Sequence, residues 1–350
     1  FKQKTAYEIR NCDWSSDVCS SDLMLLLAHI DVVEAKREDW VRDPFALTEE
    51  NGFFYARGVA DDKAMAAIWV DTLVRALKGE LPHAREIRMA LTCGEETSGA
   101  YNGAQHLMDE NRSLIDAAFA LNEGAWGKLD PQGKKVMMSI QAGEKASQNY
   151  RLEVTNPGGH SSRPVKDNAI YHLAGALTRV SALEFPVQLN DTTRVYFDRM
   201  GGILGGDMGA AMKAFVRNPA DATALATVIS DPANNAMLRT TCVATLLEGG
   251  HAENALPQRA AANVNCRIFP GETVDGTMAE LARVIGDPGV KITPKMPIRP
   301  IAVPPPLDPK VLGPAEALVA QYFPGVPLVP AMLTGATDGI FRSEEHTSEL

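Results

Sequence analysis

Hydrophobic and polar positions follow strand and helix periods in turn along the first half of the chain. Short apolar runs predict strands at residues 24–28, 53–56, 86–92 and 117–121. Segments with the length and apolar stripe of helices lie at residues 63–78 and 98–110. Strands that alternate with helices are typical of an α/β sheet, so we expect this fold class here.

The pattern changes near Gly143. Residues 150–155 and 260–269 alternate like half-exposed strands, 167–183 predict a helix, and 190–239 are mostly helical with Pro and Gly breaks. Residues 297–309 are rich in proline and are typical of a linker. The simplest interpretation is an α/β domain that is interrupted by an α+β insertion over roughly residues 145–300.

Both ends of the chain depart from this organisation. Residues 13–23 (DWSSDVCSSDL) and 342–350 (RSEEHTSEL) show neither the helical nor the strand period of hydrophobic residues. Both segments resemble translated sequencing-adapter DNA, as does KQKTAYEI near the start. One codon choice for RSEEHTSEL, reverse-complemented and read one frame over, encodes SSDVCSSDL. We therefore expect residues 1–23 and 342–350 to be adapter-derived, with the authentic termini missing. The compartment, cytoplasmic or periplasmic, then stays open.

Composition excludes several classes of protein without selecting a chemistry. The chain has 350 residues, 45% of them hydrophobic and 22% charged, with a net charge of -10. An acidic balance argues against nucleic-acid binding, and no apolar run is long enough to span a membrane. Five cysteines without a CxxC pair predict neither a disulfide scaffold nor a cysteine zinc site.

Acidic and histidine side chains directly follow the predicted strands of the first half. They are His29 and Asp31, Asp61 and Asp62, Glu95 and Glu96, and Glu123. Ligand sites of open α/β sheets lie at the carboxyl ends of strands, so these segments are expected to meet at one edge. Carboxylates packed that closely need a cation, and mixed imidazole and carboxylate ligands suit zinc or a similar divalent metal.

Each of these motifs also has a plainer interpretation when it is taken alone. His29 and Asp31 are compatible with a surface pair, Asp61 and Asp62 with capping of a helix, and the two glutamates with a solvated loop. The joint occurrence at successive strand ends favours a metal site. Cys93, beside the glutamates, is expected to be a small buried residue.

The motifs LLLAHIDVV, YARGVADDKA, CGEETSG, ALNEG and NPGGHSSRP together resemble the co-catalytic zinc peptidases. That family includes aminoacylases, acetylornithine deacetylase, succinyl-diaminopimelate desuccinylase and carboxypeptidase S, and the chain is most similar to the carboxypeptidase S-like branch. The resemblance implies an α/β zinc-exopeptidase catalytic domain with an inserted α+β lid/dimerisation domain. Its expected boundaries are 24–145 and 303–341 for the catalytic domain and 146–302 for the lid.

The resemblance also implies a role for each matching residue. His29 and Glu123 would bind one zinc ion, and Glu96 would bind the second. Asp61 would bridge both ions, and the Asp61–Asp62 peptide would be cis. Asp31 would orient His29, and Glu95 would be the general base. Cobalt or manganese could replace zinc. His160 would reach the active site of a partner subunit in a homodimer formed through the lid, and Asn254 and Arg267 would bind substrate.

The end of the chain departs from the family pattern. A loop match, GATD at residues 335–338, is weaker than the other motifs. The family has a last zinc-binding histidine well beyond this loop, and His346 is expected to be adapter-derived and not that ligand.

These observations predict hydrolysis of an amide or peptide bond in a small substrate that carries a carboxylate. Dipeptides, peptide C-termini, N-acyl amino acids and carbamoyl compounds all fit. The alternative is a non-catalytic or crippled relative that only binds small molecules, against which Glu95 argues because binding needs no base. A phosphate or dinucleotide site is disfavoured because GxGxxG and GxxxxGK[ST] are absent.

Overall fold

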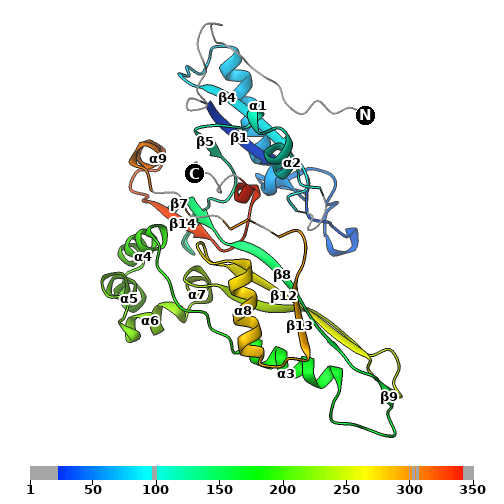
Figure 1. Ribbon diagram of the computed structural model, residues 1–350. Coiled ribbons are helices and arrows are strands. Elements are labelled where there is room, and N and C mark those ends of the chain that lie inside the picture. The colour runs from blue at the N-terminus through cyan, green and yellow to red at the C-terminus, as the bar shows by residue number, and fades with distance from the viewer. Residues whose placement is uncertain (1–22, 97–100, 299, 302–303, 305–306, 342–350) are drawn as a thin grey trace.

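The computed structural model describes residues 23–96, 101–298, 300–301, 304 and 307–341. Figure 1 shows two parts, an upper one that contains β1, β4 and β5 and a lower one built on β8, β10, β12 and β13, with β7 and β14 between them. The adapter interpretation of the tails falls outside the described residues, except that Leu23 is buried as the first residue of β1.

The upper sheet has the order β4-β1-β5, and both pairings are parallel. Its strands are β1 (Leu23–His29), β4 (Glu86–Thr92) and β5 (Phe119–Leu121), and its helices are α1 (Ala64–Leu77) and α2 (Gly103–Glu110). The apolar run of β1 is buried almost throughout, as expected of a central parallel strand. Parallel pairing brings the carboxyl ends of all three strands to one edge.

A second sheet has the order β14-β7-β6, with β7 parallel to β14 and antiparallel to β6. The strands are β6 (Gly127–Leu129), β7 (Lys135–Glu144) and β14 (Leu328–Leu333), and α9 (Pro309–Tyr322) precedes β14. The helices α4 (Asp191–Leu204), α5 (Gly206–Arg217), α6 (Ala222–Ile229) and α7 (Pro232–Met237) lie beside it (Figure 1). Phe197 and Phe215 from these helices share a core with Met137 of β7 and Val329 of β14.

The lower part is an antiparallel sheet of order β10-β12-β8-β13. The strands are β8 (Ala146–Thr155), β10 (Thr241–Gly249), β12 (Arg259–Ile268) and β13 (Val290–Pro294), and the helices are α3 (Ala169–Ser181) and α8 (Val274–Ile285). Tyr150, Leu152 and Val264 join the core that includes residues of α3 and α8, whereas Asn149 and Asn263 lie on the other face. The two-residue period of the strands separates these faces.

Short pairings complete the described fold. β2 (Thr48–Glu50) pairs with β3 (Phe53–Tyr55), and β9 (Gly159–His160) pairs with β11 (Ala255–Leu256). The β9 strand lies near the far end of the lower part, away from the upper sheet (Figure 1).

The expected elements of both halves are present, but several boundaries differ. The strand expected over residues 117–121 begins at Phe119, and the strand expected over residues 150–155 begins at Ala146. The helix expected over residues 98–110 begins at Gly103 in the structure, because Asn102 has an extended backbone and its side chain caps the helix by accepting from Gln105 N. Residues 97–100 lie outside the described residues. The helical prediction for 190–239 is confirmed by α4 to α7.

Cysteine positions also differ from expectation. Cys93 is exposed, because β4 ends at the buried Thr92 and the next side chain points to the opposite side. Cys242 and Cys266 form a disulfide between directly opposed residues of β10 and β12, which the sequence analysis did not predict. Only the strand pairing brings the two thiols together.

Lys145 connects β7 to β8 and is fully buried. Its backbone N–H donates to Leu333 O of β14 at 3.0 Å. Its ammonium donates to Ala236 O, Arg239 O and Thr241 Oγ1 at 2.8–3.1 Å. Burial lowers the pKa of Lys145 to about 7, and the positive charge of Arg267 acts in the same direction.

In the described part of the chain, no helix is long and apolar enough to cross a membrane.

His172 of α3 links the start of that helix to the turn after α8. Its Nδ1 contacts Asp287, and its Nε2 lies 3.2 Å from Asp167 Oδ1. The hydrogen bond with Asp287 raises the pKa of His172 above its ordinary value of 6.5, and the charge of Asp167 adds to this.

We predict that His172→Gln lowers thermal stability more at pH 5.5 than at pH 9. A raised folded-state pKa contributes stability that is fully present below the unfolded pKa and is lost as pH rises through the folded pKa. The expected loss at pH 5.5 is about 1–3 °C, because the ion pairs are partly exposed. Melting curves at both pH values test this, with His251→Gln, an exposed histidine, as the control. Equal losses at both pH values would contradict it.

Candidate metal centre

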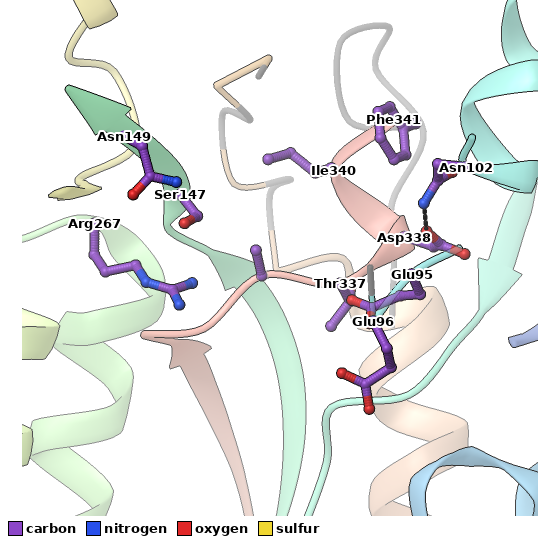
Figure 2. Close-up of a pocket in the computed structure, with 11 residues that line it drawn as sticks. Glu95, Glu96, Asn102, Ser147, Asn149, Arg267, Thr337, Asp338, Ile340 and Phe341 are labelled. Carbon is purple, nitrogen blue, oxygen red and sulfur yellow. Dashed lines mark hydrogen bonds between the residues drawn. The ribbon is translucent and has the colours of Figure 1, made fainter. Parts of the chain in front are cut away.

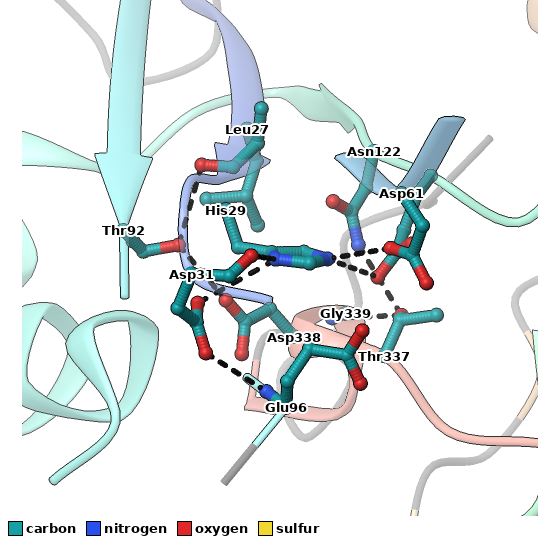
Figure 3. Close-up of polar contacts among 12 residues, drawn as sticks. Leu27, His29, Asp31, Asp61, Thr92, Glu96, Asn122, Thr337, Asp338 and Gly339 are labelled. Carbon is teal, nitrogen blue, oxygen red and sulfur yellow. Dashed lines mark hydrogen bonds and ion pairs between the residues drawn. The ribbon is translucent and has the colours of Figure 1, made fainter. Parts of the chain in front are cut away.

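The carboxyl edge of the upper sheet gathers the predicted side chains. His29 is the last residue of β1, Glu95 and Glu96 closely follow β4, and Glu123 follows β5. Asp61 comes from the turn over residues 59–63 that precedes α1. Figure 3 shows His29 at the centre of this group, with Asp31, Asp61 and Glu96 around it. The parallel strands thus bring together residues almost 100 positions apart.

The imidazole of His29 is held from both sides. Its Nε2 lies 3.0 Å from Asp61 Oδ1 and 3.6 Å from Glu123 Oε1. Its Nδ1 lies 3.5 Å from Asp31 Oδ1 and 3.3 Å from Asp31 O. Asp31 Oδ2 in turn accepts from Glu96 N at 3.1 Å. Asp31 therefore orients the ring and ties it to the glutamate loop, an arrangement typical of metal-binding histidines.

Potential ligand atoms form two overlapping sets around His29. One set is His29, Asp61 and Glu96, and the other is His29, Glu95 and Glu123. Within each set the candidate atoms all lie within 4.8 Å of one another. The Asp61–Asp62 peptide is cis. The donor set, one imidazole and several carboxylates, has the chemistry that divalent metals such as zinc accept.

Mutual repulsion dominates the electrostatics of this cluster. Burial raises the pKa of Glu95 to about 8, and the charges of Glu123 and Asp338 add to the effect. Burial and the charge of Asp61 likewise raise the pKa of Glu96. For His29, burial lowers the pKa, but the hydrogen bond and charge of Glu123 and the charges of Glu95 and Asp61 outweigh it, and the pKa rises to about 10. A bound cation would relieve this crowding.

The loop after β14 is held against the cluster by buried hydrogen bonds that the sequence analysis did not predict. Asp338 accepts from Asn102 Nδ2 at 2.7 Å and from Thr92 Oγ1 at 2.9 Å. Thr337 donates from its backbone and its hydroxyl to Glu144 Oε2 at 2.9 and 3.0 Å. The GATD motif was the signal for this loop, whereas Asn102 and Glu144 lie in no recognisable motif.

A cavity of about 270 Å³ separates this cluster from the lower sheet (Figure 2). Its lining includes Glu95, Glu96, Thr337, Asp338, Ile340 and Phe341 on one side, and Ser147, Asn149 and Arg267 on the other. The Arg267 guanidinium makes no hydrogen bond or ion pair with the described residues, so it is free to bind an anion. Its burial lowers its pKa, which the charges of Glu144 and Glu95 oppose.

The structure does not bring His160 and Asn254 to this cluster. His160 forms β9, and Asn254 O accepts from Ser161 N at 3.0 Å, so both lie at the far end of the lower part (Figure 1). His160 lines a separate open cavity with Arg163 and Leu256. Its Nδ1 accepts from Ser162 N at 3.1 Å, which leaves the proton of the neutral ring on Nε2.

An α/β sheet that presents such a cluster to a cavity is typical of hydrolases that activate water with metal ions. Residues 25–347 match the model of peptidase family M20/M25/M40, and the chain belongs to this family of metallopeptidases and amidohydrolases. The match reaches beyond Phe341, where residues including His346 lie outside the described part of the structure.

Curated relatives are similar over most of this chain. N-fatty-acyl-amino acid synthase/hydrolase PM20D1 of Homo sapiens is 32% identical, and the alignment covers 91% of this chain and 64% of the relative. Probable carboxypeptidase S-like 2 of Dictyostelium discoideum is 29% identical, with 90% and 61% covered. The chain therefore spans less than two thirds of the length of these relatives.

Solved structures show that the fold is shared. The M20 family metallo-carboxypeptidase Sso-CP2 from Sulfolobus solfataricus superimposes with a TM-score of 0.67 at 19% identity, covering 95% of this chain and 77% of that one. The dipeptidase Dug1p from Saccharomyces cerevisiae gives 0.64 at 15% identity, covering 96% and 73%. The expected α/β zinc-exopeptidase fold is thereby confirmed.

Gly124 offers a test of how the backbone positions Glu123. Its φ is +121°, and a Cβ there would lie 1.6 Å from Gln141 Oε1. Gln141 is buried, so either its side chain or the loop that carries Glu123 would have to move. We predict that Gly124→Ala weakens zinc binding at least about tenfold, because Glu123 is displaced from His29. Isothermal titration with zinc measures this.

Gly133→Ala is the matched control for backbone strain. Gly133 also has a positive φ, +78°, but a Cβ there meets nothing within 4 Å. Both substitutions should lower the melting temperature through strain in the left-handed region. Only Gly124→Ala should change metal affinity, and an unchanged affinity there would contradict this positioning role.

Proposed function

We propose that this chain hydrolyses an amide or peptide bond in a small carboxylate-bearing substrate, using two zinc ions and Glu95 as general base. The observation that carries the proposal is the crowding of Glu95, Glu96, Asp61 and Glu123 around His29, across a cavity from Arg267, which has no hydrogen-bond or ion-pair partner among the described residues. Repelling carboxylates on one wall and a guanidinium on the other suit a metal centre and a substrate anion, respectively.

His29 and Glu123 would hold the first metal, Glu96 the second, and Asp61 would be shared between them. The contacts of His29 with Asp61 and Glu123 support this assignment, as does the placement of Glu96 within the first ligand set. Zinc, cobalt and manganese all accept imidazole and carboxylate ligands. Bound there, the metals would supply Lewis acidity that lowers the pKa of a water molecule and polarises the scissile carbonyl.

Glu95 would move the proton. It lines the cavity beside the cluster, and its raised pKa of about 8 suits a group that must both take up and release a proton near neutral pH. Glu95 accepts a proton from the attacking water as the oxygen bonds to the carbonyl carbon. It then gives this proton to the leaving nitrogen as the C–N bond breaks, so an amine and a carboxylic acid are released.

Arg267 would bind the carboxylate of the substrate. Its planar fork matches the two oxygens of a carboxylate, and its lack of a partner among the described residues leaves the fork available. The similar proteins include an N-fatty-acyl-amino acid synthase/hydrolase, a probable carboxypeptidase S-like protein and a dipeptidase. Dipeptides, peptide C-termini and N-acyl amino acids are therefore the substrate classes to test first.

We predict that Glu95→Gln lowers kcat about 10²- to 10⁴-fold while zinc content is unchanged, because the amide cannot accept the proton. Zinc-loaded protein is assayed on dipeptides and N-acetyl amino acids, with metal analysis in parallel. Glu110→Gln, an exposed helix residue, is the control. Full activity of Glu95→Gln would refute the mechanism. A wild-type protein that binds these compounds without hydrolysing them would instead be the non-catalytic relative.

We further propose that a homodimer through the lower part completes the site. β10 is the edge strand of its sheet within the described residues, and it exposes Val243, Leu246 and Leu247. A long edge strand with exposed apolar side chains favours pairing with a second copy. The Nε2–H donor of His160, remote from its own metal cluster, would then stabilise the oxyanion in the partner's cavity, with Asn254 beside it.

Mixing two inactive variants tests this arrangement. His160→Ala retains Glu95, and Glu95→Gln retains His160, so a mixed dimer contains one intact site. After dissociation and random reassociation, activity should return to about a quarter of the wild-type value. Glu95→Gln mixed with Glu123→Gln should recover no activity, because each substitution disables the metal cluster of its own chain and no intact site can form. Failure of the first mixture to recover activity, with mixed dimers verified, would contradict a shared site.

A further inference from the structure

One face of the lower sheet forms the cavity wall opposite the metal cluster. Ser147 and Asn149 of β8 share this face with Asn263, Asn265 and Arg267 of β12, because alternate residues of a strand point to the same side. The apolar core with α3 and α8 occupies the other face. Polar side chains therefore extend from the cavity across the sheet.

The hydrogen bonds within this row set the orientation of the Asn149 amide. Asn149 Oδ1 accepts from Asn263 Nδ2 at 2.8 Å and from Asn265 Nδ2 at 3.1 Å, which satisfies both of its lone pairs. Asn149 Nδ2 donates to no group in the described part of the chain. Figure 2 shows this nitrogen on the side of the amide that faces Ile340, across the cavity. Asn149 therefore presents hydrogen-bond donors to a ligand.

Ser147 and Arg267 give the wall the same character. They are directly opposed in the pairing of β8 with β12. Ser147 Oγ accepts from Asn265 Nδ2 at 3.2 Å, so its hydroxyl proton remains available for a ligand. The Arg267 guanidinium can only donate. Each of the three groups that this wall offers to the cavity can thus donate, and Arg267 and the Asn149 amide nitrogen can only donate, so a ligand that meets these two must supply acceptors.

The number of donors calls for more than one carboxylate. The Arg267 fork matches both oxygens of a single carboxylate. Ser147, directly opposite Arg267, and Asn149, two residues further along β8, add further donors on the same wall. One carboxylate would meet Arg267, and a second oxygen-bearing group would meet Asn149.

We propose that Asn149 is a specificity-determining residue that selects substrates whose amino-acid portion carries an acidic side chain. A carboxylate offers only acceptors and so matches the Asn149 amide, whereas the ammonium of a basic side chain offers only donors and does not. Ile340 and Phe341, which also line the cavity, would contact the aliphatic part of the side chain. This inference rests on the hydrolytic function proposed above.

Three N-acetyl amino acids with zinc-loaded wild-type protein give the first test. N-acetylglutamate, N-acetylnorleucine and N-acetyllysine differ in the group that reaches Asn149. We expect kcat/KM to be at least about tenfold higher for the glutamate compound than for the lysine compound. Equal values, or a preference for lysine, would overturn the inference without any substitution.

Asn149→Asp gives the second test. The aspartate keeps an oxygen to accept from Asn263 and Asn265, and it replaces the cavity-facing donor by a charged acceptor. We expect kcat/KM for N-acetylglutamate to fall about tenfold or more, mainly through KM, and the value for N-acetyllysine to rise. The norleucine value measures the general effect of the added charge on substrate binding, and the changes for the other two compounds are compared with it. Asn218→Asp, an exposed position in the same inserted segment, adds the same charge and should leave the preference unchanged.

Binding separates failure of this inference from failure of the proposed function. If no N-acetyl compound is hydrolysed, the function is wrong for this substrate class, and isothermal titration with N-acetylglutamate and N-acetyllysine then decides. Tighter binding of the glutamate compound, reversed in Asn149→Asp, supports the inference. Equal affinities, or an unchanged preference in the variant, refute it.

Discussion

Repulsion among carboxylates at one sheet edge is the constraint on which the rest of the structure depends. Parallel pairing of β1, β4 and β5 forces the residues that follow them together, and none can move away without leaving the strand ends. Burial then raises the cost of every negative charge, as the elevated pKa values of Glu95 and Glu96 show. Two hydrogen-bonded supports hold the crowded side chains in place. Asp31 fixes the His29 ring, and the Thr337–Asp338 loop closes the group from the side of β14. The fold thus holds mutually repelling carboxylates close together, and a bound divalent cation would relieve this repulsion.

The lower sheet has the complementary role. Its core-facing residues are apolar and pack with α3 and α8, so its other face is free to be polar. Arg267, Ser147 and Asn149 use that freedom, and they confront the acidic cluster across about 270 Å³. Under the proposed function, opposite charges on opposite walls would orient a substrate, with its anionic end at the lower sheet and its reacting bond at the metal cluster. Neither part of the chain could provide this alone.

Local patterns predicted β1, β3, β4, β5, β8 and β12, the helices α1 to α7 and the residues of the metal cluster, because each lies in or follows a clear periodic run. The strands β7, β10, β13 and β14 and the helices α8 and α9 were not predicted. The cis Asp61–Asp62 peptide was implied by family resemblance and is present.

The hydrogen-bond supports could not be predicted in this way. Asn102 and Asp338 are 236 positions apart, and nothing in either neighbourhood indicates the other. The same holds for the Cys242–Cys266 disulfide, which depends on strand register, and for Asn149, whose importance lies in the direction of its amide. Cys93 was expected to be buried and is exposed, because its position relative to the end of β4 decides its side.

Lys145 has a mechanical consequence. It is the single residue between the last residue of β7, whose carboxylate holds Thr337, and the first residue of β8, whose strand carries Asn149. Its backbone is bonded to β14 and its ammonium to the segment that leads into β10. A connection this short cannot act as a tether. A rotation of the lower sheet would therefore be passed directly to Glu144 and to the loop that Glu144 holds beside the metal cluster. Opening the cavity and loosening the support of Thr337 would then be one motion, and a substrate that draws the two walls together would tighten that support as it binds.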